Sequence, residues 1–394
     1  MTMQIPVYDE DMFDQAAVRN ARAVDDAIRE LAPVVKLARE NITILGRFEH
    51  VSNGLRDWHT FSSTSRPWHD PNSVRPELLL TDDPPQHTRV RSVIAAALAP
   101  RALARMSQSF QADAAQLVDR LLDRAGETLD AVADITQPFV YKVLPDLLGL
   151  PQWGRENMSA FGDMVWATLG PPNELFEDAM ANIDEVTRWV DQCCNRENLD
   201  AEGLGMQMFL AADRGEIKPD EAKLLIQILL SAAADTTVMT MGTAIRAFCL
   251  FPDQYRLLRA EPGLLRSTFD ESLRWDSPSR MAGRITTREV RIEGYTIAAG
   301  ERCGLLFAAA NRDPRRWQDP DRFDIKRDHR GHLGWGFGVH ACVGRILAQL
   351  EADALLGAII KKIERFELAG EPEPWMTTIG HGPAKLPIRI VPAA

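Results

Sequence analysis

The chain has 394 residues, of which 45% are hydrophobic and 26% are charged, a composition typical of a folded protein of enzyme size. Its net charge of -11 argues against a general nucleic-acid or anionic-membrane binder, and no run of about 20 apolar residues predicts a membrane span. Five scattered cysteines without a CxxC pair argue against disulfides or a zinc site, and we expect free thiols at Cys193, Cys194, Cys249 and Cys303. The N-terminus carries no targeting signal, so we expect a cytoplasmic monomer.

Short and mixed elements are predicted for the first quarter of the chain. Helical periodicity, β-branched runs and proline punctuation predict a helix over 11–31, antiparallel strands over 34–37 and 42–45, and a helix over 47–58. The segment 61–83 is rich in Ser, Pro, Asp and Asn without periodicity, which predicts a long irregular loop. Long loops in compact proteins often carry function.

Helices dominate the rest of the chain. The pattern predicts helices over 86–98, 106–125, 131–150, 155–169, 174–195, 203–214 and 220–249, two more after Pro252 of which the second covers 263–275, and one over 345–363, with a small sheet over 284–307 and final strands over 379–391. The helix over 220–249 is apolar on nearly all sides, so it belongs in the middle of the molecule. We therefore predict a mainly α fold with a small β region near 34–45, 284–307 and 379–391, forming a single domain over 1–394.

The stretch His332–Gly344 is the most informative of the sequence. Glycines at 334, 336 and 338 remove side chains from alternate positions, so a flat rigid body could lie against the backbone. Cys342 stands where this loop enters a helix, and a helix N-terminus favours the thiolate, which ligates metal. For a cysteine in isolation, a glycine-rich turn around a buried structural thiol would be the simpler interpretation.

The same stretch closely resembles the haem-binding signature of the cytochrome P-450 family: aromatic, Gly, any, Gly, any, His, any, Cys, any, Gly. The resemblance implies a triangular prism-like fold with a long central helix over haem b (iron protoporphyrin IX). It makes Cys342 the axial thiolate and metal ligand, His340 a donor to a haem propionate, and Gly344 the end of the signature. Trp335 replaces the usual Phe, and we expect its indole to cover the thiolate side of the ring with its N–H near the sulfur.

A polar interruption of the long helix, Ser231–Thr237, is the second motif. An acid beside a hydroxyl among alanines leaves room for a ligand, although a threonine bonded to its own turn beside a surface acid would look the same. In the resembling family, the residue matching Thr236 holds dioxygen and water and the residue matching Asp235 relays protons, so both are expected to be catalytic. Ala233 stands where the family often has Gly.

Two further groups match the family. Glu271 and Arg274 lie on one helix face and match a structural Glu-x-x-Arg pair that holds the segment through Trp317, Pro320 and Phe323. We expect the haem propionates to be bound by three cations, His87, Arg91 and Arg284. The alternative is that these are ordinary basic residues of the surface.

The reaction implied is monooxygenation with dioxygen, by hydroxylation or O-dealkylation. Nothing in the chain resembles a flavin or iron–sulfur module, so the resemblance implies a separate ferredoxin and its NAD(P)H-linked reductase. We expect an acidic ferredoxin to dock on a basic patch of Arg89, Arg101 and Arg345. A peroxide-driven peroxygenase and a non-catalytic haem-thiolate sensor are the alternatives.

The substrate pocket is expected to be mostly apolar and to take a small hydrophobic or aromatic compound. The loop and long helix are similar to those of bacterial members that oxidise para-substituted aromatic acids, for which Ser231 and Arg75 could hold the carboxylate, with Arg280 as a further cation. The lining residues we expect are Arg75, Leu78, Leu79, Trp166, Leu169, Ile228, Ser231, Ala232, Ser279, Met281, Ala282 and Ile379.

Overall fold

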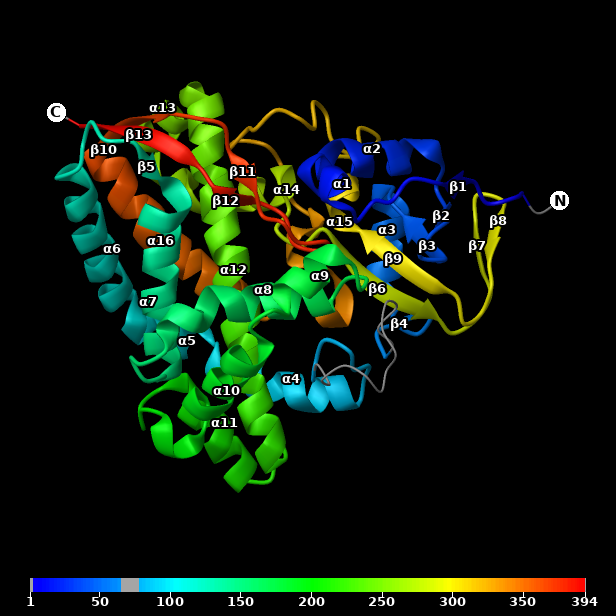
Figure 1. The fold of residues 1–394 in the computed structure, drawn as a ribbon, viewed down its shortest axis with the longest axis horizontal. Coiled ribbons are helices and arrows are strands. Elements are labelled where there is room, and N and C mark those ends of the chain that lie inside the picture. The colour runs from blue at the N-terminus through cyan, green and yellow to red at the C-terminus, as the bar shows by residue number, and fades with distance from the viewer. Residues whose placement is uncertain (1–2, 65–77, 394) are drawn as a thin grey trace.

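The computed structural model describes residues 3–64 and 78–393, and helices make up most of this part of the chain (Figure 1). The helices are α1 (Gln15–Arg19), α2 (Ala21–Leu31), α3 (Phe48–Arg56), α4 (Gln86–Ala97), α5 (Pro100–Leu103), α6 (Ser107–Leu122), α7 (Gln137–Leu148), α8 (Met158–Thr168), α9 (Glu174–Ala179), α10 (Ile183–Cys193), α11 (Leu204–Asp213), α12 (Pro219–Leu250), α13 (Pro252–Ala260), α14 (Leu265–Trp275), α15 (Phe307–Ala310) and α16 (Arg345–Lys362).

Most of the strands lie in two groups at opposite sides of the molecule (Figure 1). Within the described residues the largest sheet has the strand order β1 (Val7–Tyr8), β2 (Val35–Leu37), β3 (Ile42–Leu45), β9 (Arg302–Leu306), β6 (Met281–Thr286) and β4 (Phe61–Ser62). A three-stranded sheet has the order β10 (Ile363–Leu368), β13 (Pro387–Pro392) and β5 (Leu129–Asp130). Two further sheets have two strands each: β7 (Val290–Ile292) pairs with β8 (Tyr295–Ile297), and β11 (Glu373–Pro374) pairs with β12 (Pro383–Lys385). The mainly helical fold class predicted from the sequence is confirmed.

Helix α12 runs through the middle of the helical region and contacts α7, α8, α11, α14 and α16 (Figure 1). Pro219 occupies its first turn, the Glu221 carboxylate accepts from the Lys218 backbone N–H, and Pro252 follows its end. The helix is long and apolar enough to cross a membrane, but 72% of its most apolar window is buried inside the fold. It is therefore the core helix that its sequence predicted.

Several predicted boundaries were wrong. The helix over 11–31 is divided at Asn20, whose side chain donates to the Ala16 carbonyl oxygen and so ends α1. The helix over 174–195 is divided between α9 and α10. The antiparallel pair β2–β3 is confirmed, but it joins β6 and β9 in one sheet, and β3 runs parallel to β9. The strands β1, β4, β5 and β10 were not predicted; the first three have only two residues each, too few to show a period.

Candidate active site

A cavity of about 330 Å³ lies among α8, α12, β6 and the Gly334–Cys342 loop, a size within the usual range for ligand sites. Aliphatic and aromatic side chains form most of its wall. Cys342 of the loop and Thr236 of α12 both line it. The structure thus brings together the two motifs that the sequence singled out, although 106 residues separate them in the chain.

Three hydroxyls of α12 donate hydrogen bonds to the backbone of their own helix. Thr236 Oγ1 donates to the Ala232 carbonyl oxygen at 2.7 Å, and Thr240 Oγ1 donates to the Thr236 carbonyl oxygen at 2.6 Å. Ser231 Oγ donates to the Ile228 carbonyl oxygen at 3.2 Å. Hydroxyls satisfied in this way keep the helix intact while their oxygens can still accept a proton.

Asp235 does not line the cavity with its neighbour Thr236. Its carboxyl is buried, and Oδ1 accepts a hydrogen bond of 3.0 Å from the Tyr141 hydroxyl on α7. Burial raises the pKa of Asp235 to about 8. The acid and the alcohol of the pair therefore face different sides of α12.

Two of the three loop glycines are needed by the packing of the protein itself. A Cβ on Gly334 would lie 2.8 Å from the Leu273 Cβ of α14. Gly338 has a φ of +68°, and its Cβ would lie 2.5 Å from the Leu55 carbonyl oxygen of α3. The expectation that all three glycines make room for a flat ligand was wrong for Gly338, which makes room for α3.

The Cys342 sulfur sits at the start of α16. The backbone N–H of Cys342 donates to the Trp335 carbonyl oxygen at 2.7 Å, and this hydrogen bond joins the two ends of the loop. The side chain is exposed to the cavity yet deep among protein atoms, and burial raises the pKa of the thiol. Backbone N–H groups of Gly344 and Arg345 and the Arg91 charge act in the opposite direction, toward the thiolate that would bind a metal.

The position of the Trp335 side chain differs from the one predicted from the sequence. Its ring lines the cavity, but its indole N–H donates to Asp270 Oδ1 at 2.7 Å. The Arg345 guanidinium carbon lies 5.6 Å from the ring centroid. The N–H is thus bound to a carboxylate and is not the donor to the sulfur that we expected.

The expected propionate residues gather beside the Cys342 loop. The His87 and His340 rings lie 4.5 Å apart, and Arg91 donates to the Ala341 carbonyl oxygen. Arg284 lines the cavity, and burial lowers its pKa to about 10. Burial, followed by the Arg284 charge, lowers the pKa of His340 to about 3.

Both ring nitrogens of His87 are buried without a hydrogen-bond partner among the described residues. An unsatisfied imidazole and two guanidinium groups form a buried cluster that favours an anion. A haem, which carries two carboxylates and an iron that binds thiolate, fits these residues and Cys342 together.

The substrate predictions divide into three groups. Cavity-lining residues as predicted are Trp166, Leu169, Ser231, Ala232, Ser279, Met281, Ala282 and Ile379. Leu78, Leu79 and Ile228 do not line the cavity, and Arg75 lies outside the described residues. The lining residues that sequence reasoning missed include Leu80, Thr81, Val165, Thr168, Thr240 and Phe307. Thr240 lies one helical turn after Thr236, and that spacing could have identified it.

Arg280 is not a substrate cation. Its Nε and Nη2 donate to Asp25 Oδ1 at 2.9 and 2.6 Å, and its Nη1 donates to the Met12 carbonyl oxygen at 3.0 Å. Both members of the pair are buried. Arg280 therefore ties the N-terminal helices to the start of β6.

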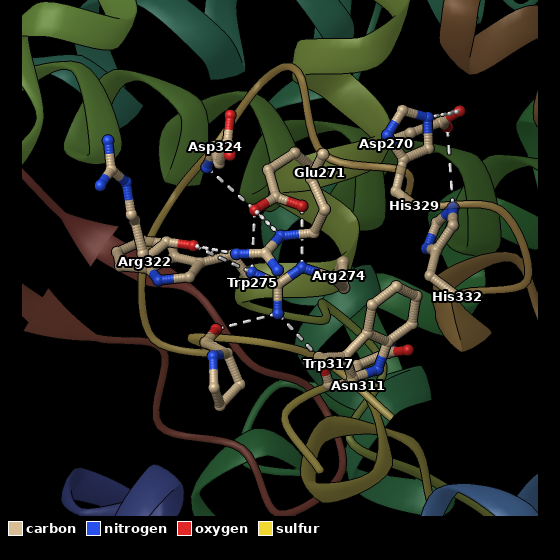
Figure 2. Close-up of polar contacts among 12 residues, drawn as sticks. Asp270, Glu271, Arg274, Trp275, Asn311, Trp317, Arg322, Asp324, His329 and His332 are labelled. Atoms are coloured by element: carbon tan, nitrogen blue, oxygen red, sulfur yellow. Dashed lines mark hydrogen bonds and ion pairs between the residues drawn. The ribbon is translucent and has the colours of Figure 1, made fainter. Parts of the chain in front are cut away.

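The predicted Glu271–Arg274 pair is fully buried in α14 and bidentate, with both contacts at 2.8 Å (Figure 2). Arg274 also donates to the carbonyl oxygens of Asn311 and Pro320, and Glu271 accepts from the Asp324 backbone N–H. Asn311 Oδ1 in turn accepts from the Leu333 backbone N–H at 2.6 Å. The pair therefore supports the Cys342 loop through the segment that follows α15.

Known proteins are similar to this chain in sequence and in fold. A family model described as Cytochrome P450 matches residues 154–389. Cytochrome p450 CYP199A2 of Rhodopseudomonas palustris is 39% identical over 378 residues, covering 93% of this chain and 90% of that protein. Vitamin D(3) 25-hydroxylase of Pseudonocardia autotrophica is 30% identical over 376 residues, covering 91% and 90%.

A solved structure of CYP109E1 from Bacillus megaterium in complex with testosterone matches with a TM-score of 0.84. It covers 95% of this chain and 99% of that chain at 24% identity, which supports the fold alone. From the family model, the two relatives and the motifs gathered on one cavity, we conclude that the chain belongs to the cytochrome P450 family of haem-dependent monooxygenases.

Proposed function

We propose that Cys342 ligates the haem iron and that the enzyme inserts one oxygen atom of dioxygen into a C–H bond of a small hydrophobic or aromatic compound. The observation that carries this proposal is that Cys342 and Thr236 line the same cavity. His87, Arg91, Arg284 and His340 would hold the haem propionates. Bound haem supplies the activation of dioxygen, which no side chain can supply.

The proposed role of this chain's residues is to exclude water and deliver protons. Thr236 presents a hydroxyl oxygen to the cavity, held by its bond to Ala232. Asp235, with a pKa of about 8, keeps a proton near neutral pH. We assign the proton source to Asp235 and the final donor at the cavity to Thr236.

The cavity wall supports an apolar substrate with few polar groups. Among the described lining residues Arg284 is the one guanidinium, and it belongs to the propionate cluster. The hydroxyls available to a substrate include those of Ser231 and Ser279. We propose small aromatic compounds, including para-substituted aromatic acids, as the substrate class, with Ser231 and Arg75 as candidate carboxylate partners.

A spin-state titration tests the substrate class. Purified holoenzyme is titrated with benzoic acids bearing para alkoxy or alkyl groups, with terpenes and with fatty acids. A shift to high spin with the aromatic acids supports the proposal. Shifts confined to fatty acids or terpenes would contradict it.

We propose that the electrons come from a ferredoxin and its reductase. Arg345 is the best-supported docking residue, because its side chain is 52% exposed and its guanidinium lies over Trp335 at the cavity wall. Arg101 is also exposed. Arg89 is a weaker candidate, since Glu221 of α12 already binds it in two places.

Charge reversal tests this surface. Arg345→Glu should slow reduction by an acidic ferredoxin and flatten its dependence on salt. An unchanged rate and salt dependence would remove Arg345 from the docking site.

Electron sources distinguish this function from other haem-thiolate proteins. The reduced carbon monoxide spectrum establishes the thiolate ligand, and turnover is then compared with NADH plus ferredoxin system and with hydrogen peroxide. We expect turnover with the ferredoxin system. Turnover with peroxide but not with the ferredoxin system would indicate a peroxygenase, and no turnover with either electron source would indicate a sensor. We further propose a monomeric, cytoplasmic enzyme formed by one domain; the burial of α12 supports only its role as a core helix and not as a membrane span.

A further inference from the structure

The carboxyl of Asp235 is separated from bulk water by two helices. The residue is 4% exposed, and α7 and α8 both contact α12 where it lies. A Cβ on Gly162 of α8 would come within 2.0 Å of Asp235 Oδ2, so the α8 backbone packs directly over this carboxyl. A proton that reaches Asp235 from outside must cross this layer.

Tyr141 of α7 provides the contact across it. Its hydroxyl donates to Asp235 Oδ1 at 3.0 Å, and the Trp166 side chain of α8 also faces this carboxyl and lowers its pKa. The phenol oxygen also interacts with the side chains of Gln137 and Ser159. Tyr141, Gln137 and Ser159 are all half-buried whereas Asp235 is buried, so these polar groups lie nearer to solvent than the acid does.

Monooxygenation consumes protons as well as electrons, because the second oxygen atom leaves as water. A buried acid that gives up a proton must regain one before the next turnover. Burial raises the pKa of Asp235 to about 8, the Tyr141 hydrogen bond lowers it and the Asp163 charge of α8 raises it further. Asp235 can therefore both hold and release a proton near neutral pH, provided that it has a supply.

We propose that Tyr141 is the positioning residue through which Asp235 regains its proton. The phenol hydrogen passes to Asp235 Oδ1 as the phenol oxygen takes the Ser159 hydroxyl hydrogen, and a hydronium ion of the solvent then returns a hydrogen to the Ser159 oxygen and leaves as water. No bond to carbon changes and no electron moves in this step. The inference rests on the proposed role of Asp235 as the proton source.

Tyr141→Phe is the variant that tests it, with Tyr255→Phe as the matched control. Tyr255 is buried elsewhere, and its hydroxyl donates to the Ile363 carbonyl oxygen at 2.9 Å, so the control also loses one phenol hydrogen bond. Both changes keep the aromatic ring. Effects seen in Tyr141→Phe alone therefore report on its contact with Asp235.

The first measurement needs no substrate. The infrared carboxyl band of Asp235, assigned by difference from Asp235→Asn in the holoenzyme, is titrated with pH. Loss of a hydrogen bond to the charged form should move the midpoint to higher pH in Tyr141→Phe and leave it unchanged in Tyr255→Phe.

The second measurement is turnover of para-methoxybenzoate with the ferredoxin system, counted as formaldehyde per NADH in H2O and D2O. Tyr141→Phe should lower this ratio about fivefold, the factor expected for one hydrogen bond, and enlarge the solvent isotope effect. Turnover driven by hydrogen peroxide, which brings its own protons, should stay at the wild-type level.

A Tyr141→Phe enzyme with unchanged midpoint, ratio and isotope effect would overturn the proposal, and so would an equal loss in Tyr255→Phe. If wild-type enzyme does not oxidise para-methoxybenzoate, the proposed substrate class fails; the infrared titration still tests the Tyr141–Asp235 contact, and the coupling ratio is then measured with a compound that gives the high-spin shift. If Asp235→Asn keeps the wild-type ratio, the proposed role of Asp235 fails, and the Tyr141 relay with it.

Discussion

The indole N–H of Trp335 donates to Asp270 Oδ1 at 2.7 Å, so the residue that departs from the family signature is fixed by an acid of α14. His329 and Arg345 also approach the second oxygen of this acid, at 3.4 and 3.6 Å. Figure 2 shows Asp270 beside His329 and His332, next to the Glu271–Arg274 pair. Although burial opposes it, these partners hold the pKa of Asp270 below its usual value, so the group is charged at neutral pH.

A charge at this position should affect the haem potential. Asp270→Asn is expected to raise it by tens of millivolts, because removing a negative charge favours the reduced haem by about 1 kcal/mol at an intermediate dielectric. Trp335→Phe should also shift the potential while leaving the fold intact, since Asp270 then loses a donor. Spectroelectrochemical titration measures both, and potentials within error of wild type would end the tuning role of Trp335 and Asp270.

The buried pair of α14 should be essential for stability. Arg274→Ala leaves the Glu271 carboxylate without its bidentate partner and frees the carbonyl oxygens of Asn311 and Pro320. We expect a loss of roughly 3–5 kcal/mol, with low haem content, because the segment that supports the Cys342 loop loses its anchor. Urea unfolding and haem absorbance measure these effects, and Arg266→Ala, at an exposed ion pair on the same helix, is the control. Equal stability of both variants would contradict this account.

Loss of the Thr236 hydroxyl should uncouple the reaction. Thr236→Ala keeps α12 intact, since alanine favours helix and the hydroxyl bonds only within its own turn. NADH consumption should persist while product per NADH falls about tenfold or more, with hydrogen peroxide formed instead. Thr243→Ala, at a buried position further along α12, is the control. Wild-type coupling in Thr236→Ala would show that the hydroxyl is dispensable.

Glu351 should make stability fall as pH rises. It is fully buried on α16, and burial raises its pKa to about 8 although the Thr237 hydroxyl of α12 lowers it. Above the ordinary pKa of a glutamate, the Glu351 carboxyl keeps its proton in the folded protein and releases it in the unfolded chain. The contribution of Glu351 to the free energy of unfolding is therefore fully present at low pH. This contribution declines by about 1.4 kcal/mol per pH unit until the pH passes the pKa of the folded state.

Glu351→Gln removes this titration. Urea unfolding of wild type and variant from pH 5 to pH 9 should show a smaller decline in the variant, with the largest difference at the alkaline end. Parallel curves would mean that the carboxyl finds a charged or polar partner, and the burial argument would fail.

The signature around Cys342, the Asp235–Thr236 pair and the apolar run of α12 were all legible in the sequence, because each depends on local residue types and spacing. The periodicity determined the mainly helical class, and the resemblance of the motifs to the cytochrome P-450 family implied the haem chemistry. Side-chain direction was not legible. Asp235 and Thr236 are adjacent in α12, so helix geometry already points them about 100° apart, but only the packing of α7 and α8 puts Tyr141 opposite the acid and leaves the alcohol at the cavity.

The remaining surprises have the same cause. Gly338 was expected to leave space for a ligand, but it leaves space for α3. Arg280 was expected to bind substrate, but it is paired with Asp25. The Trp335 N–H was expected near the Cys342 sulfur, but it donates to Asp270. Each depends on a neighbour that is distant in sequence, and no local periodicity encodes such contacts. The sequence by itself determined the family motifs at Cys342 and Asp235–Thr236, whereas the tertiary structure decided which side chains line the cavity and which partners they face, because a hydrogen bond or close contact depends on positions that only packing sets.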